Sequence, residues 1–334
     1  MIMTSPEFSA ENPRQYAREI LNQSSRVISE AVAIVSPDNP GVSPLDIFPA
    51  PKERRSDDEG IELTEDQELR LRTCAAELGF GRQSNRSMSE LGLYGGHVII
   101  EGGYAHKMLA EALLVVEDQS ADPASIVISV TPNRQIDDAE REITARVLGI
   151  EVANVGKTEY EVARQVANTI PGFEKAEFET ELPYRYDIDD EFKVFGGSNG
   201  QFTSIGRVGH APVILLRVDR EDYIDEGGDH QYRNQPDAAA LIKIVDSILR
   251  NNGDTIYPIA FVTSGTYQPS REVDGARAAL SVNRKVGIPT YGTELLALVK
   301  GESIPAPGPV NQLPGEFHKM VLQVQRLQEV IEKS

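Results

Sequence analysis

The sequence is poor in cysteine and contains no long apolar run. Its 334 residues include one cysteine, Cys74, which excludes an internal disulfide framework and a zinc site of the CxxC type. Cys74 falls within a helical apolar pattern, so we expect a buried, unreactive thiol. No apolar stretch reaches the roughly 18 residues that cross a bilayer, and the N-terminus lacks the basic and apolar regions of a secretory signal. These absences predict a cytoplasmic protein without a membrane partner.

Basic residues are also few relative to acidic ones. The chain has 33 basic and 52 acidic side chains, which gives a formal net charge of -19. This charge repels nucleic-acid phosphates and anionic lipid surfaces. The cationic run at 52–55 is followed at once by acidic residues at 57–59, which is typical of a solvated linker. We therefore expect no nucleic-acid partner.

Several familiar motifs are missing. The full GxGxxG dinucleotide fingerprint is absent, and the lack of a GxxxxGK[ST] run argues against a P-loop nucleotidase. No GxSxG nucleophile elbow is present, which argues against a covalent serine hydrolase. The acidic loop at 225–230 fits a divalent ion only loosely and matches no metal motif, so we expect no metal site.

The N-terminal part of the chain has helical patterns separated by a proline-rich segment. Apolar residues at helical spacing predict an amphipathic helix over about 13–35. Thr64-Glu-Asp-Gln67 is a capping box, which predicts a helix running to about Leu78. Residues 1–90 are therefore expected to form a mainly helical region, with residues 36–62 as its linker.

From His97 onward, short apolar runs alternate with helical patterns. Continuous apolar runs such as 126–130 and 213–218 are typical of strands covered on both faces. We expect an α/β core over 91–300, with a Rossmann-like three-layer parallel sheet and an inserted hairpin or lobe at 171–209. The expected strands are 97–101, 126–130, 150–155, 212–218, 257–263 and 285–290. The expected helices are 104–117, 137–148, 158–169, 235–250, 270–281 and 292–300.

Residues 301–334 read as a linker followed by an amphipathic helix. Five apolar residues repeat there at 3-4-3-4 spacing, which is the pattern of a helix docked in a groove or of a short coiled coil. Docking on the same chain is the favoured interpretation, and a homodimer paired through this helix is the alternative. The five residues are Phe317, Met320, Val324, Leu327 and Ile331.

Two strand-to-helix junctions identify a candidate ligand site. Gly102 and Gly103 follow the first core strand, and glycines there let backbone amides approach an anion, although a tight turn explains them equally well. The second junction supplies Thr263, Ser264, Tyr267 and Arg271. In a parallel sheet both junctions lie at the carboxyl edge, where ligands bind.

Three further residues extend this candidate site. Arg134 follows the second core strand, where its guanidinium can bind a phosphate or carboxylate. Asp219 follows the fourth core strand, where an acid can accept a ribose hydroxyl. Asp219 and His106 are the candidate catalytic bases, although a histidine at a helix start is more often solvated.

Parts of these junctions resemble the YdcF/SanA/ElyC-like bacterial proteins. The similar features are a strand ending in Gly102-Gly103, a strand ending near Ser129, and Phe261-Val-Thr-Ser264 running into Tyr267-Gln-Pro-Ser-Arg271. The resemblance covers roughly 97–300 and departs at Gln268, where the family commonly has histidine. It implies a Rossmann-like sheet and, by analogy with some members, S-adenosylmethionine as a cofactor.

These observations leave three functional hypotheses. The first is a protein that binds a nucleotide-type or S-adenosylmethionine-like small molecule at the carboxyl edge of the sheet. The second is a transferase or hydrolase acting on a phosphorylated or sugar-nucleotide substrate at the same place. The third is a non-catalytic assembly protein that acts through its terminal helices.

Overall fold

A computed structural model gives the fold of most of the chain. It describes residues 13–39, 41–48, 63–80, 95–103, 105–117, 122–130, 134–186, 198–218, 222–224, 230–232, 238–251, 259–264, 268–282, 286–287, 290–291 and 313–333. The helix expected at 292–300 lies outside these residues.

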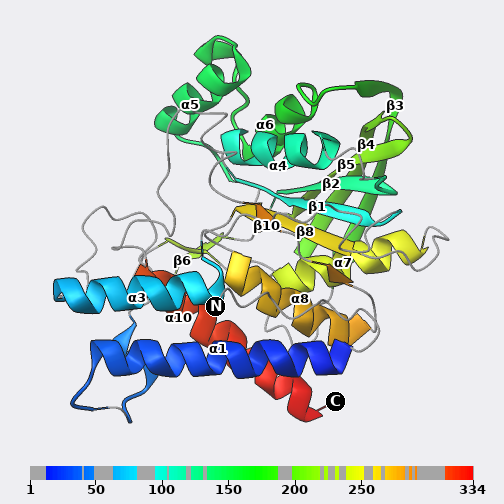
Figure 1. The fold of residues 1–334 in the computed structure, drawn as a ribbon. Coiled ribbons are helices and arrows are strands. Elements are labelled where there is room, and N and C mark those ends of the chain that lie inside the picture. Colours follow the sequence, from blue (N-terminus) through cyan, green and yellow to red (C-terminus); the bar gives the residue numbers. More distant parts are fainter. Residues whose placement is uncertain are drawn as a thin grey trace.

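A mixed β-sheet lies at the centre, with helices on both faces (Figure 1). Its strand order is β10-β8-β1-β2-β5-β4-β3. The four central strands run parallel: β8 (Ile259–Ser264), β1 (His97–Glu101), β2 (Ser125–Val130) and β5 (Ala211–Val218). The short strands β9 (Val286–Gly287) and β10 (Thr290–Tyr291) pair parallel with β8. A separate small hairpin joins β6 (Asp222–Ile224) to β7 (His230–Tyr232).

The expectation of a wholly parallel sheet is wrong at one end. The segment expected as an insertion forms a hairpin of β3 (Phe173–Tyr186) and β4 (Ser198–Val208), which extends the main sheet. A tight turn at Gly209 and His210 joins β4 to β5. So short a connection allows only antiparallel pairing, because a parallel crossover needs a dozen or more residues.

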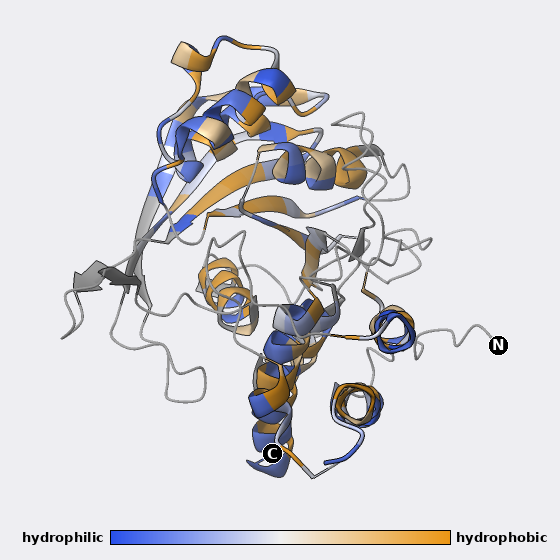
Figure 2. Cartoon of the chain, turned by 90° about the vertical axis from the view of Figure 1, so that its left-hand side faces the viewer, coloured by the Kyte–Doolittle hydropathy of each residue, from blue (hydrophilic) through white to orange (hydrophobic). Residues whose placement is uncertain are grey.

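The apolar runs form strands because both faces of the sheet are covered. Ile100 and Ile128 pack with residues of α4 (Ala105–Glu117) and α6 (Glu159–Ala167). Ile99 and Phe261 pack with α7 (Ala238–Asn251) and α8 (Gln268–Val282) on the opposite face. Successive strand residues thus alternate between two cores, which is why these strands lack polar alternation. Figure 2 shows the central strands as predominantly hydrophobic.

The strand expected at 150–155 is absent. Helix α5 (Asp138–Leu148) ends at Gly149, which adopts a left-handed conformation, and α6 starts at a capping box formed by Thr158 and Glu161. The connection contains a single 3-10 turn, η1 (Val152–Asn154), and Val152 is 42% exposed. Among the described residues, no strand pairs with this short apolar run between two capped helices.

The terminal helices form a further layer outside α8. Helices α1 (Pro13–Val35), α3 (Glu65–Leu78) and α10 (Leu313–Lys333) share one apolar cluster with Val273 and Ala276 of α8, and the short α2 (Pro44–Ile47) packs at its edge. Figure 1 shows α1 and α10 below α8, on the side away from the sheet. The five residues of the C-terminal pattern are all buried in this cluster within the chain: Phe317, Met320, Val324, Leu327 and Ile331. Among the described residues, no helix has the length and hydropathy to span a membrane.

Candidate functional site

The helices that follow β1 and β8 lie on opposite faces of the sheet. These two strands are parallel neighbours, but β1 leads to α4 on one face of the sheet and β8 leads to α8 on the other (Figure 1). The connections therefore diverge at the carboxyl ends of the two strands. Such a topological switch point is where open α/β sheets bind ligands.

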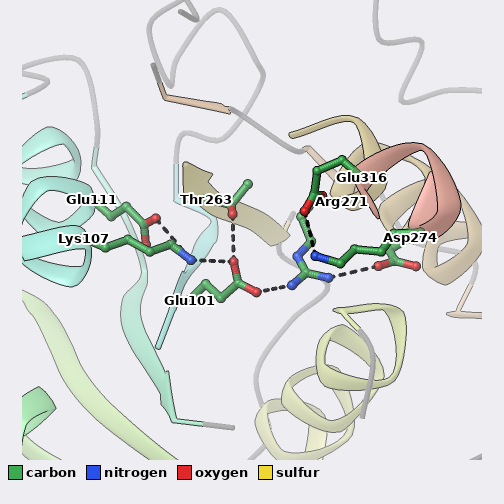
Figure 3. A network of polar contacts seen from close by, with 8 residues as sticks. Glu101, Lys107, Glu111, Thr263, Arg271, Asp274 and Glu316 are labelled. Carbon is green, nitrogen blue, oxygen red and sulfur yellow. Dashed lines mark hydrogen bonds and ion pairs between the residues drawn. The ribbon is translucent and has the colours of Figure 1, made fainter. Parts of the chain in front are cut away.

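Glu101, the last residue of β1, is the centre of a polar network at this point (Figure 3). Its Oε2 accepts hydrogen bonds from Lys107 Nζ at 2.9 Å and from Thr263 Oγ1 at 2.8 Å. Its Oε1 accepts a hydrogen bond from Arg271. One carboxylate thus joins the two diverging connections, because Lys107 lies on α4 and Arg271 on α8.

Opposing effects act on the pKa of Glu101. Burial raises the pKa, but the charges of Arg271 and Lys107 and the hydrogen bonds from Lys107 and Thr263 hold it well below its usual range. Glu101 is therefore ionised throughout the neutral pH range. The carboxylate favours folding above the pKa of an unfolded glutamate, and this stabilisation is lost as the pH falls.

Arg271 is held from three directions. Besides Glu101, its Nη1 contacts Asp274 Oδ2 at 3.4 Å, and its guanidinium carbon lies 5.8 Å from the centre of the Phe261 ring. Asp274 is fully buried and also accepts a hydrogen bond from Arg277 Nη2 at 3.1 Å. Arg271 is thus both a structural ion-pair residue and a cation at the sheet edge, where its side chain remains 22% exposed.

The two glycines after β1 have conformational reasons to be glycine. A Cβ atom on Gly102 would lie 2.2 Å from the carbonyl oxygen of Ser129, because the chain stays close to β2 directly after the pairing of Glu101 with Ser129. Gly103 has φ of +147°, a region that side chains disfavour. Close approach and a turn therefore account for both residues without a bound anion.

Arg134 belongs to a second ionic cluster. Its Nη1 and Nη2 donate to the two carboxylate oxygens of Glu140 at 2.6 and 2.5 Å, and its Nε lies 2.9 Å from Glu159. Burial raises the pKa of Glu159 to about 7 even though Arg134 lowers it. The charge of Lys107 also lowers this pKa, which places the cluster within electrostatic reach of the Glu101 network. Arg134 thus connects the starts of α5 and α6.

The remaining candidate residues are only partly described. His106 is buried at the start of α4, and the backbone of Ser264 ends β8. Asp219 and Tyr267 lie outside the described residues. No group of three or more His, Cys, Asp or Glu side chains that could hold a metal ion occurs in the described part of the chain.

The structure brings together Thr263 and Arg271 and adds three residues that sequence reasoning missed. These are Glu101, Lys107 and Glu111. Glu101 could have been predicted as a site residue, since it is an acid at the end of an apolar strand directly before two glycines. Lys107 and Glu111 carried no such signal, because charged residues four apart are common on helices.

Comparison with protein-family models, with curated proteins and with solved structures finds no match for this chain. The resemblance to the YdcF/SanA/ElyC-like proteins therefore stays a prediction.

Proposed function

We propose that this protein binds a small ligand of nucleotide or S-adenosylmethionine type at the carboxyl ends of β1 and β8. The observation that carries this proposal is the network of Glu101, Lys107, Thr263 and Arg271 at the topological switch point. A buried network that served stability alone would not need to lie at this edge of the sheet.

The network offers a ligand both signs of charge within one small region. A carboxylate at the end of a strand can accept hydrogen bonds from ribose hydroxyls or from an amino group. Lysine and arginine can bind a phosphate or a carboxylate. Nucleotides combine ribose with phosphate, and S-adenosylmethionine combines ribose with an amino and a carboxylate group. The side chains of Lys107, Glu101 and Arg271 are 12%, 15% and 22% exposed, so a ligand at the edge can contact them.

A ligand screen by differential scanning calorimetry tests this proposal. The panel is S-adenosylmethionine, S-adenosylhomocysteine, AMP, ATP and UDP-glucose, each at several concentrations. A ligand at 100 times its dissociation constant adds roughly 2.7 kcal/mol to the free energy of unfolding, which raises the melting temperature. We expect at least one compound to do so, and stabilisation by none of them would reject the proposal.

Two variants then locate the site. Thr263→Val removes a hydroxyl donor to Glu101 with little change of shape, so it should weaken binding by about tenfold if the network contacts the ligand. Arg207→Ala is the control, because it removes an exposed arginine ion pair on the β3–β4 hairpin. Equal binding by both variants would place the ligand elsewhere.

A further inference from the structure

Ser129, near the carboxyl end of β2, has a buried hydroxyl group that the fold does not use. The residue is fully buried, and its Oγ has no hydrogen-bond partner among the described residues. The other buried serine and threonine side chains of the described strands each have a partner: Ser125 Oγ lies 2.8 Å from His97 Nδ1, Thr203 Oγ1 accepts from the Tyr160 hydroxyl at 3.2 Å, and Thr263 Oγ1 donates to Glu101 Oε2 at 2.8 Å. Because buried polar groups are nearly always hydrogen-bonded, the exception needs an explanation.

Ser129 lies beside Glu101 in the sheet. The two residues are register partners of β2 and β1. Their side chains point to the same face, because strand residues alternate and the residues two positions earlier, Val127 and Ile99, both belong to the core on the α7–α8 side. Neighbouring strands lie about 4.8 Å apart, so a single ligand group can reach both the hydroxyl of Ser129 and the carboxylate of Glu101.

The carboxylate of Glu101 also has hydrogen-bonding capacity that the fold leaves open. Its Oε2 accepts from Lys107 and Thr263, whereas its Oε1 accepts from Arg271 alone (Figure 3). A carboxylate oxygen has two lone pairs, so Oε1 can accept one further hydrogen bond. The hydroxyl of Ser129 can both donate and accept. Two adjacent groups at the switch point can therefore bond a ligand without breaking the network.

We propose that Glu101 and Ser129 together bind the vicinal hydroxyl pair of the ligand's ribose. One ribose hydroxyl donates to Glu101 Oε1, and its neighbour bonds Ser129 Oγ. The inference rests on the proposed function and names the group that the site recognises, since nucleotides and S-adenosylmethionine both carry this pair. An anionic group fits poorly at this position, because it would face the carboxylate of Glu101.

The contact with Ser129 requires a local movement. Glu101 is 15% exposed and can meet the ligand directly, whereas Ser129 is 0% exposed. The side chains that cover Ser129 must therefore move before its hydroxyl bonds a ribose. It follows that the hydroxyl contributes to affinity and not to the stability of the fold, and the two effects can be measured separately.

Urea denaturation of Ser129→Ala and Ser125→Ala tests the effect on stability. Both serines are buried on β2, but only Ser125 has a partner. Ser125→Ala should lower the urea midpoint, because buried His97 loses this hydrogen bond. Ser129→Ala should keep or exceed the wild-type midpoint, because it removes an unpaired buried hydroxyl. A loss in Ser129→Ala as large as that in Ser125→Ala would show a structural role and overturn the inference.

Calorimetric titration then tests the contact with ribose. The probes are the tightest binder of the ligand panel and its analogues that lack the 2′- or the 3′-hydroxyl of the ribose. In wild type, we expect loss of the contacting hydroxyl to weaken binding by about tenfold. In Ser129→Ala the same loss should matter clearly less, because the hydrogen bond is already absent. Ser125→Ala is the control and should discriminate as wild type does.

The outcomes separate this inference from the proposed function. If wild type and Ser129→Ala discriminate equally against both analogues, or neither protein discriminates, the ribose contact is wrong and the proposed function stands. If no compound of the panel binds to wild type, both fail.

Discussion

Glu101 bonds to both helices that follow the two central strands, α4 after β1 and α8 after β8. Its carboxylate is the shared acceptor for Lys107, Thr263 and Arg271, and these donors belong to three different elements. Arg271 cannot be regarded purely as a ligand contact, since it is also an ion-pair partner of Glu101 and Asp274. Replacing Arg271 should therefore lower stability as well as affinity.

Replacement of Glu101 by glutamine should destabilise the protein in a pH-dependent way. At pH 7 we expect the free energy of unfolding to fall by about 3 kcal/mol, the low end for breaking a buried ion pair. The pKa of Glu101 is lower in the folded than in the unfolded state, so its contribution is complete above the unfolded value of about 4.3 and is lost at lower pH.

Urea denaturation of wild type and Glu101→Gln at pH 7, 5 and 3 measures this difference. The difference in the free energy of unfolding between wild type and Glu101→Gln should become smaller towards pH 3. Glu174→Gln is the control, because Glu174 is 63% exposed in its ion pair with Arg207 and should contribute less than about 1 kcal/mol. If this difference did not depend on pH, the ion pairs of the Glu101 carboxylate would not be the source of the stabilisation.

Gly102→Ala should destabilise the protein whether or not a ligand is present. A Cβ atom would lie 2.2 Å from the carbonyl oxygen of Ser129, so the end of β1 would have to move away from β2. Overpacking of this kind costs about 1–3 kcal/mol. Gly41→Ala is the control, because a Cβ atom there meets nothing within 4 Å. Equal unfolding midpoints in urea for the two variants would show that β1 can move away from β2 without loss of stability.

At the scale of elements, the local patterns predicted most helices and central strands, and the failures have local causes. Helix α3 begins at the expected capping box, because Thr64 and Gln67 each bond the backbone of the other. The run at 150–155 resembled a strand but lies between two capped helices, and no strand in the described part of the chain pairs with it. A strand requires a neighbour, and neighbours are not visible in a short window of sequence.

Phe317→Ala tests the docking of α10. The Phe317 ring is fully buried, with ring centres 5.1 Å from Phe48 and 5.9 Å from Phe80. Truncating such a side chain costs about 3–5 kcal/mol, which we expect to see as a lower urea midpoint. Phe178→Ala is the control, because Phe178 is 81% exposed on β3. If α10 instead paired between chains, Phe317→Ala would lower the mass measured by light scattering, and the unfolding midpoint would depend on protein concentration.

At the scale of the whole molecule, α10 links the C-terminus to the first helix and to the helix that carries Arg271. The cluster beyond α8 contains residues of α1, α3, α8 and α10, so segments from both ends of the sequence complete one apolar core. Pairing of two chains through α10 would first require this core to open. A homodimer through this helix stays a prediction; in the described structure the five apolar residues of the C-terminal pattern are buried within the chain.

Local patterns along the chain were enough to predict most helices and central strands, and also the two junctions where a site was expected. Periodicity, capping residues and continuous apolar runs act over a few residues, so they can be read along the chain. Three features depend on the folded chain: β8 lies beside β1, the 173–208 hairpin joins the sheet antiparallel, and Glu101 contacts Arg271. Those two residues are 170 positions apart, and strand order is set by the packing of distant segments. The low pKa of Glu101 also depends on the fold, because its burial and its charged neighbours exist only in the folded chain.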